Sequence, residues 1–208
     1  ALRGDDARAR SIVQLARKAR LFATGGRGPG APEMTSGDGA NAVFLTLYDG
    51  PPTKCPEVIE LVASLEPHFA LVSPNGPRGD SQEYFFDPFY GPAQFVPLPS
   101  VFADFPTNAW AAVEAILSSP TRPYYRDRVT LALSDLGPEV SVTVHDPDKP
   151  VAPGLESERD MFLFTMTFRP PGFTPRPDAG GKDTENSLSG NALDNLYCLL
   201  HGIDPEAD

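Results

Sequence analysis

The chain has 208 residues, of which 40% are hydrophobic and 22% are charged, so it can bury one substantial core. Its formal net charge of -11 opposes binding to phosphate backbones and to anionic lipid surfaces, and it fits either cationic partners or an acidic surface that keeps the protein soluble. The composition therefore predicts neither a nucleic-acid partner nor a membrane partner.

Cysteine usage and hydropathy indicate the compartment. The two cysteines, Cys55 and Cys198, lie far apart in the sequence, which is not the pattern of a disulfide-rich secreted domain. No apolar run approaches the roughly 20 residues that span a bilayer, and arginines stand at the N-terminus where a signal peptide needs an apolar stretch. We expect a soluble, cytoplasmic protein in a reducing environment.

The first quarter of the chain predicts one helix and one strand. Residues 5–22 carry apolar side chains at three- and four-residue spacing with arginines between them, the pattern of an amphipathic helix. Residues 24–40 are rich in glycine and proline and predict a flexible loop. The run "NAVFLTLYDG", residues 41–50, is apolar, short and followed by two prolines, which predicts a buried strand.

The middle of the chain alternates helical and extended patterns. A helix is predicted for residues 55–65, with Pro56 in its first turn and Pro67 at its end. Two strands follow, at residues 68–73 and 83–90, joined by a loop of turn-forming residues. A second helix is predicted for residues 107–119, with Thr107 as its N-terminal cap.

The C-terminal half predicts a meander of three antiparallel strands. Residues 128–146 alternate apolar and polar side chains on either side of a Gly-Pro turn, and residues 162–168 continue the alternation after a long loop. Residues 170–190 show no pattern and predict a flexible segment, and residues 191–203 predict a final helix. The fold class is therefore α+β: a single domain over residues 1–208, mostly antiparallel sheet, with helices packed on one face.

A histidine and an aspartate form the first candidate site. A hairpin turn centred on residues 77 and 78 places His68 opposite Asp87, at about the 5 Å that separates cross-strand partners. The stretch from 68 to 91 resembles the transglutaminase-like core of the papain-type superfamily, in which a histidine on one strand and an aspartate on the next complete a cysteine triad. The resemblance implies that Cys55, at the N-terminus of the preceding helix, is the nucleophile of a hydrolase or acyltransferase.

Distance argues against this triad. A helix from Pro56 to residue 65 rises about 1.5 Å per residue, so Cys55 and the strand that begins near His68 lie roughly 15 Å apart. The dipeptide Asp87-Pro88 is also a turn signal, and His68 follows a proline at a strand end. We favour a structural role for the pair.

An aromatic segment forms the second candidate site. Residues 84–105 combine eight aromatic side chains with four prolines, and aromatic groups on a stiff extended backbone lose little entropy when they bind a partner. Packing of the same rings in the core is an equal alternative. The candidate binding residues are Tyr84, Phe86, Phe89, Tyr90, Phe95 and Phe102.

These observations predict a non-catalytic binding domain that takes a protein partner or forms a subunit of an assembly, with its oligomeric state open. The polar group His145, Asp146 and Asp148 lies in one loop without a second histidine, so we expect a solvated loop there. The sequence predicts no metal and no cofactor.

Overall fold

The computed structural model describes residues 6–23, 33–73, 82–85, 97–134, 137–146, 162–173 and 184–204. Within these ranges the helices are α1 (Asp6–Lys18), α2 (Ser36–Leu47), α3 (Cys55–Ser64), α4 (Ala109–Ser118) and α5 (Gly190–His201), with a short 3-10 helix η1 at Pro52–Lys54. The strands are β1 (Glu66–Ser73), β2 (Gln82–Phe85), β3 (Arg128–Ser134), β4 (Gly137–Asp146), β5 (Phe162–Arg169) and β6 (Thr184–Ser189).

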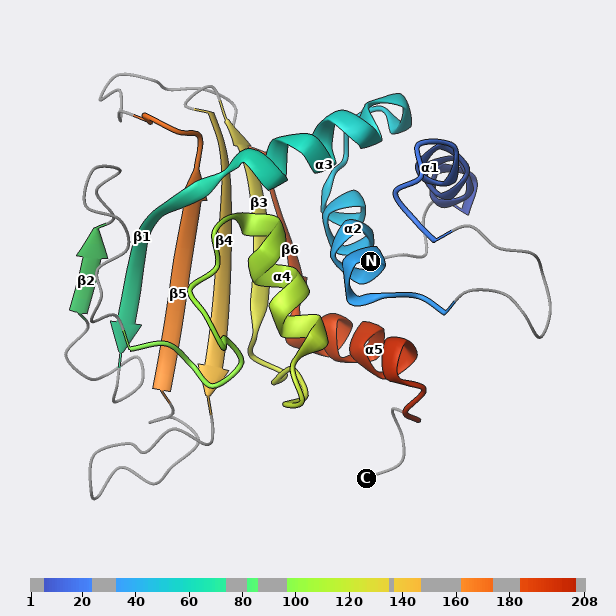
Figure 1. Cartoon of the computed structure of the whole chain (residues 1–208). Helices are drawn as coiled ribbons and strands as arrows, with labels where there is room; N and C mark the ends of the chain where they lie inside the picture. The colour runs from blue at the N-terminus through green and yellow to red at the C-terminus, as the bar shows by residue number, and fades with distance from the viewer. Residues whose placement is uncertain are drawn as a thin grey trace.

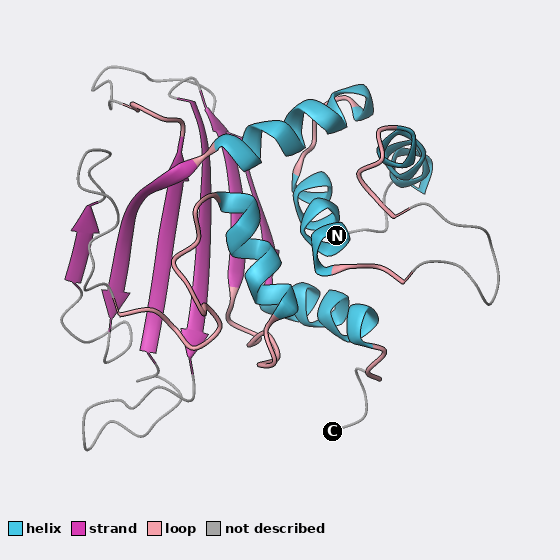
Figure 2. Ribbon diagram, in the orientation of Figure 1, coloured by secondary structure: helices cyan, strands magenta, loops and turns pink. Residues whose placement is uncertain are grey.

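The six strands form one antiparallel sheet in the order β2-β1-β5-β4-β3-β6. The predicted meander is confirmed, because β3, β4 and β5 are neighbours in chain order. All helices of the described ranges lie on one side of this sheet (Figure 1; Figure 2). Helices α2, α4 and α5 contact strands directly, and α1 packs further out against α3 and η1. The α+β class and the one-sided arrangement of helices agree with the sequence prediction.

Alternation along the strands builds the core. Along the middle of β3, β4 and β5, alternate side chains point toward the helices and are almost completely buried, because their neighbours face the other side of the pleat. The inward set on these strands is Val129, Leu131, Val140, Val142, Val144, Phe162, Phe164, Met166 and Phe168. Helices α2, α3, α4 and α5 close the same cluster from above, so sheet and helices share one hydrophobic core.

The prediction of a strand at residues 41–50 is wrong, because most of that run belongs to helix α2. Its N-terminus carries a capping box: the Thr35 side chain accepts a hydrogen bond from the Asp38 N–H, and the Asp38 carboxylate accepts one from the Thr35 N–H. The flexible loop predicted for residues 24–40 therefore ends before Ser36. Helix α2 contacts α3, α4 and α5, so it is apolar on most sides and resembles a buried strand in sequence.

Two further boundaries differ from the prediction. The segment 170–190 was expected to be flexible throughout, yet it contains β6 at the sheet edge and the first residue of α5. Gly190 starts α5 against the backbone of Tyr124 and Tyr125, and a side chain at this position would overlap their carbonyl groups. Helix α4 is capped by Asn108, whose side chain accepts from the Ala111 N–H at 2.8 Å, and not by Thr107.

Candidate functional site

Cys55 occupies the predicted position at the first residue of α3, but it lies inside the core with an exposed fraction of 0%. Burial raises the pKa of the Cys55 thiol, and the charge of Arg8 opposes this with a smaller effect. The thiol stays protonated at neutral pH. This environment disfavours the thiolate that a nucleophilic cysteine requires.

The fold does not bring Cys55 and His68 together. Helix α3 runs for 10 residues between them, as expected, and at about 1.5 Å per residue it spans about 15 Å. In Figure 1 this helix leads from the α1 side of the molecule to the start of β1. Asp87 lies outside the described residues. The β1–β2 pairing joins Phe69 to Phe85, a register one residue away from the one that places Asp87 opposite His68.

His68 belongs to a different cluster. The pairing of β1 with β5 shifts between Pro67 and Phe69, so His68 lies in a β-bulge. Its ring meets the Phe173 ring edge-on at 5.7 Å between centroids, and the Arg169 guanidinium lies over the same phenyl ring at 4.5 Å. Arg169 also forms an ion pair with Glu139 at 2.5 Å. Burial lowers the pKa of His68, the Arg169 charge lowers it further, and Glu139 raises it by less.

The depressed pKa of His68 predicts a stability that falls with acid. Because the folded pKa lies below the unfolded value of 6.5, the unfolded chain binds more protons between these two pKa values. Stability is therefore fully present above about pH 6.5 and is lost as the pH falls through the folded pKa of His68. Urea unfolding from pH 8 to pH 5 should show a smaller acid loss for His68→Gln than for wild type. A difference between the two proteins that does not change with pH would contradict the prediction.

The aromatic candidates that the structure describes pack toward the core. Phe102 has an exposed fraction of 5%, and its ring lies 5.9 Å from that of Phe164. Tyr84 is partly buried and packs against the same core cluster. Phe86, Phe89, Tyr90 and Phe95 lie outside the described residues. The two described residues therefore follow the core-packing alternative.

A polar cluster joins the end of β4 to the start of β3. We call Asp127, His145, Asp146 and Ser100 the Asp127 cluster. The Asp127 carboxylate accepts hydrogen bonds from the backbone N–H groups of Tyr124 at 2.9 Å and His145 at 2.7 Å, and the Asp146 carboxylate accepts one from the Ser100 N–H at 2.5 Å. His145 Nδ1 lies 3.4 Å from Asp127 Oδ1, too long for a good hydrogen bond.

The Asp127 cluster holds backbone in place rather than binding a substrate. The cavity beside it has a volume of about 10 Å³, room for about one water molecule, whereas ligand pockets occupy about 300–1,000 Å³. Asp148 lies outside the described residues. In the described part of the chain, no group of three or more histidine, cysteine or acidic side chains is placed to hold a metal ion.

Among the described residues, one side of the sheet faces away from all the helices (Figure 1). We call it the outer face. Cross-strand partners point to the same side of a sheet, so the registers define rows of side chains across it. One central row is Phe69, Thr167, Ser141, Thr130 and Ser187, and the next is Glu83, Leu71, Thr165, Thr143, Arg128 and Ser189.

Hydroxyl groups dominate the middle of the outer face. The Ser141 and Thr167 hydroxyls lie 3.3 Å apart, and those of Thr143 and Thr165 lie 3.1 Å apart, each pair linked across β4 and β5. Thr167 is buried between its neighbours, whereas Thr143 and Thr165 are partly exposed. The sequence carried this signal as hydroxyl residues alternating with core residues in 128–144 and 162–169, but alternation alone does not show which strands are neighbours.

The comparisons with known proteins add no family to this geometry. No protein-family model matches the chain, and searches of curated proteins and of solved structures find no similar chain. In the described ranges, no helix is both long enough and apolar enough to cross a lipid bilayer.

Proposed function

We propose that this chain is a non-catalytic protein-binding domain and that its partner binds the outer face of the sheet. One observation carries the proposal: on β1, β5 and β4 the two central rows carry no charged side chain, and the charged ends of the second row, Glu83 and Arg128, lie on the flanking strands β2 and β3. Charge depletion at the centre of a surface, with charged residues at its margin, is the composition of protein interfaces.

The central side chains suit a partner surface in size and chemistry. Phe69, Leu71 and Leu163 supply partly exposed apolar area on β1 and β5, and the paired hydroxyls of β4 and β5 supply donors and acceptors beside it. The rigid sheet beneath holds them in place before binding, which reduces the entropy that association costs. The two cysteines are free and buried, which supports a reducing compartment.

Catalysis has less support among the described residues. Cys55 is a buried thiol whose pKa is raised, and α3 separates it from His68. The cavity beside the Asp127 cluster is too small for a substrate. A binding role therefore fits the described geometry better than a cysteine-dependent hydrolase or acyltransferase does.

A substitution at the centre of the outer face tests the proposal. The tagged full chain would capture partners from cells, and the partner identified by mass spectrometry would be purified and titrated against each variant. Thr165 lies between Leu71 and Thr143, so Thr165→Arg should weaken binding at least about tenfold by placing a bulky charge at the interface centre. Thr165→Arg and the control variant Thr46→Arg should each keep the wild-type melting temperature within about 3 °C.

The matched control is Thr46→Arg. Thr46 is exposed on α2, on the helical side of the molecule, so the same change there should leave the affinity unaltered. The proposal would be overturned if the purified partner bound Thr165→Arg as tightly as it binds the wild type. It would also be overturned if every protein captured by the wild type were captured equally by Thr165→Arg.

A further inference from the structure

One margin of the outer face is an acidic row. The registers pair Glu66 of β1 with Arg169 of β5, and Ala132 of β3 with both Glu139 of β4 and Glu185 of β6. The ion pair between Arg169 and Glu139 joins these two sets into one row across five strands. We call these residues the acidic row. It borders the uncharged row that begins with Phe69, so a partner seated on the centre also meets this margin.

The negative charge of the acidic row is not balanced within it. The Arg169 guanidinium bonds to Glu139 through Nε at 2.6 Å and Nη2 at 2.5 Å, so this arginine is already matched to one carboxylate. Glu66 and Glu185 are both exposed at the two ends of the row. The row therefore presents net negative charge, and the exposed cation of this face, Arg128, lies two rows away on β3.

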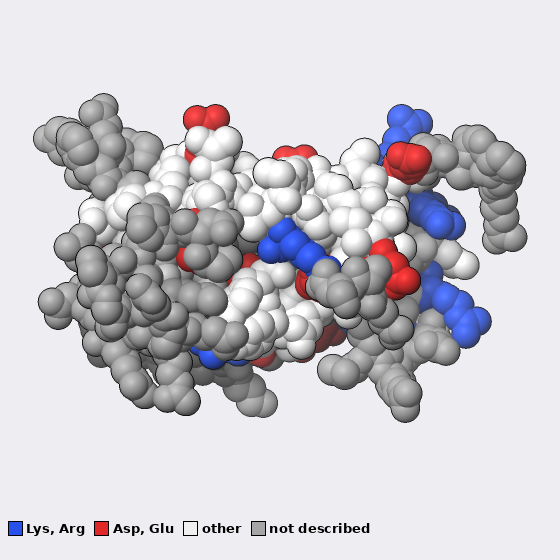
Figure 3. Space-filling view, turned by 90° about the horizontal axis from the view of Figure 1, so that it is seen from below, with Lys and Arg blue, Asp and Glu red and all other residues white. Residues whose placement is uncertain are grey.

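The basic residues near the N-terminus do not offset this charge. Helix α1 carries Arg8, Arg10, Arg17 and Lys18, and it packs beyond α3 on the helical side of the sheet. Figure 3 shows Lys and Arg side chains gathered at the end of the molecule where α1 lies. Helix α1 lies on the helical side of the sheet in Figure 1, whereas the registers place Glu66 and Glu185 on the outer face.

We propose that the partner is a separate basic protein that places an uncharged patch over the central rows and Lys or Arg side chains along the acidic row. This inference rests on the proposed function of the outer face. Complementary charge at an interface margin accelerates encounter and fixes the orientation of the partner. The net charge of -11 on this chain adds a long-range attraction for a cationic protein.

A second copy of the chain fits less well than a basic partner. If two copies buried the same face against each other, two chains that each carry a net charge of -11 would meet, and they would repel each other. A contact between α1 of one copy and the acidic row of another joins two different surfaces, and such contacts build open filaments unless the rotation closes a ring. The occupant that the charges favour is therefore another protein.

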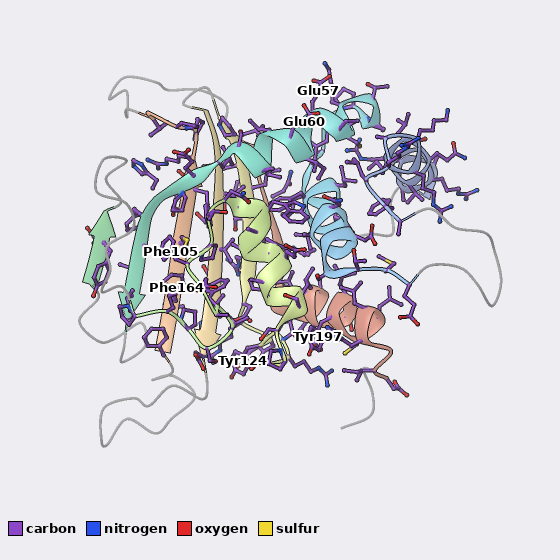
Figure 4. All side chains as sticks on the ribbon, viewed as in Figure 1. Glu57, Glu60, Phe105, Tyr124, Phe164 and Tyr197 are labelled. Carbon is purple, nitrogen blue, oxygen red and sulfur yellow. The ribbon has the colours of Figure 1, made fainter. Side chains whose placement is uncertain are left out.

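Charge reversal with the purified partner tests the inference. Glu66→Lys and Glu185→Lys combined should weaken binding about tenfold, mainly through slower association. Raising the salt concentration from 50 to 500 mM should weaken wild-type binding and should affect the double variant less. The matched control is Glu60→Lys on α3, an exposed position on the helical side that Figure 4 labels, and it should bind as wild type does. Sedimentation of the chain alone should give a monomer.

The outcomes separate the two proposals. If Thr165→Arg abolishes binding but the double variant binds normally and salt has no effect, the outer face binds a partner that is not basic, and this inference is overturned while the proposed function stands. If the chain alone sediments as a dimer or filament that Thr165→Arg dissociates, the occupant is a second copy and the inference is also overturned. If Thr165→Arg loses no partner, both proposals fail.

Discussion

Phe164→Ala should lower the free energy of unfolding by about 3–5 kcal/mol. Phe164 lies on β5 at the centre of the sheet, has an exposed fraction of 0%, and packs against Phe102 from the segment that precedes α4. Figure 4 shows Phe164 on β5, on the side covered by that segment. Removing the phenyl ring leaves a cavity among residues from the sheet and the overlying segment, and these cannot collapse into it without moving β5 or α4.

Urea unfolding followed by circular dichroism measures this effect, and two further variants bracket it. Phe164→Leu keeps much of the buried volume and should cost clearly less than Phe164→Ala. Thr165→Ala, the next residue on the outer face, should change stability by less than about 1 kcal/mol. If Phe164→Ala lowered the free energy of unfolding no more than Thr165→Ala does, the placement of Phe164 in the core between the sheet and the helices would be disproved.

Asp127→Ala is the second large effect, with an expected loss of about 3–5 kcal/mol. Asp127 is buried, with an exposed fraction of 3%, and its two carboxylate oxygens each accept a backbone N–H, from Tyr124 and from His145. Alanine leaves both donors buried without this acceptor, and an unsatisfied buried donor costs about 1–3 kcal/mol. The adjacent cavity has room for about one water, which replaces one acceptor at most.

The same unfolding measurement distinguishes this role from a general effect of charge. Asp127→Asn keeps one acceptor oxygen, so about half of the loss should remain. Asp49→Ala removes an exposed carboxylate after α2 and should change stability by less than about 0.5 kcal/mol. Equal stability of Asp127→Ala and wild type would show that the two N–H groups find other acceptors.

Periodic patterns made much of the fold predictable. Residues 128–146 and 162–168 alternate because one face of each strand packs under the helices, and this period identifies strands without any knowledge of their neighbours. The helices at residues 6–18, 55–64, 109–118 and 190–201 carry apolar side chains on the face that meets the core, so they were found with small errors at their ends.

The prediction failed where the surroundings decide the structure. Helix α2 is buried on several sides, so its sequence contains the nearly continuous apolar run Val43, Phe44, Leu45 and Leu47. Such a run shows neither helical nor strand periodicity, so the sequence pattern cannot distinguish the two structures. Among the described side chains of β6, Leu188 packs against the core and the others are polar, because the strand forms by pairing with β3 at the sheet edge. No local signal distinguishes such a strand from a loop.

For this protein the sequence by itself determined the fold class, the meander and the identity of most core residues, because burial of alternate or helically spaced side chains is a local property of the chain. Only the tertiary structure decided the candidate site. It aligned Thr165 of β5 with Thr143 of β4, and Glu66 of β1 with Arg169 of β5. A row across a sheet joins residues that are far apart in the chain. Strand order and register decide which residues share a row, and both arise from the packing of the whole domain.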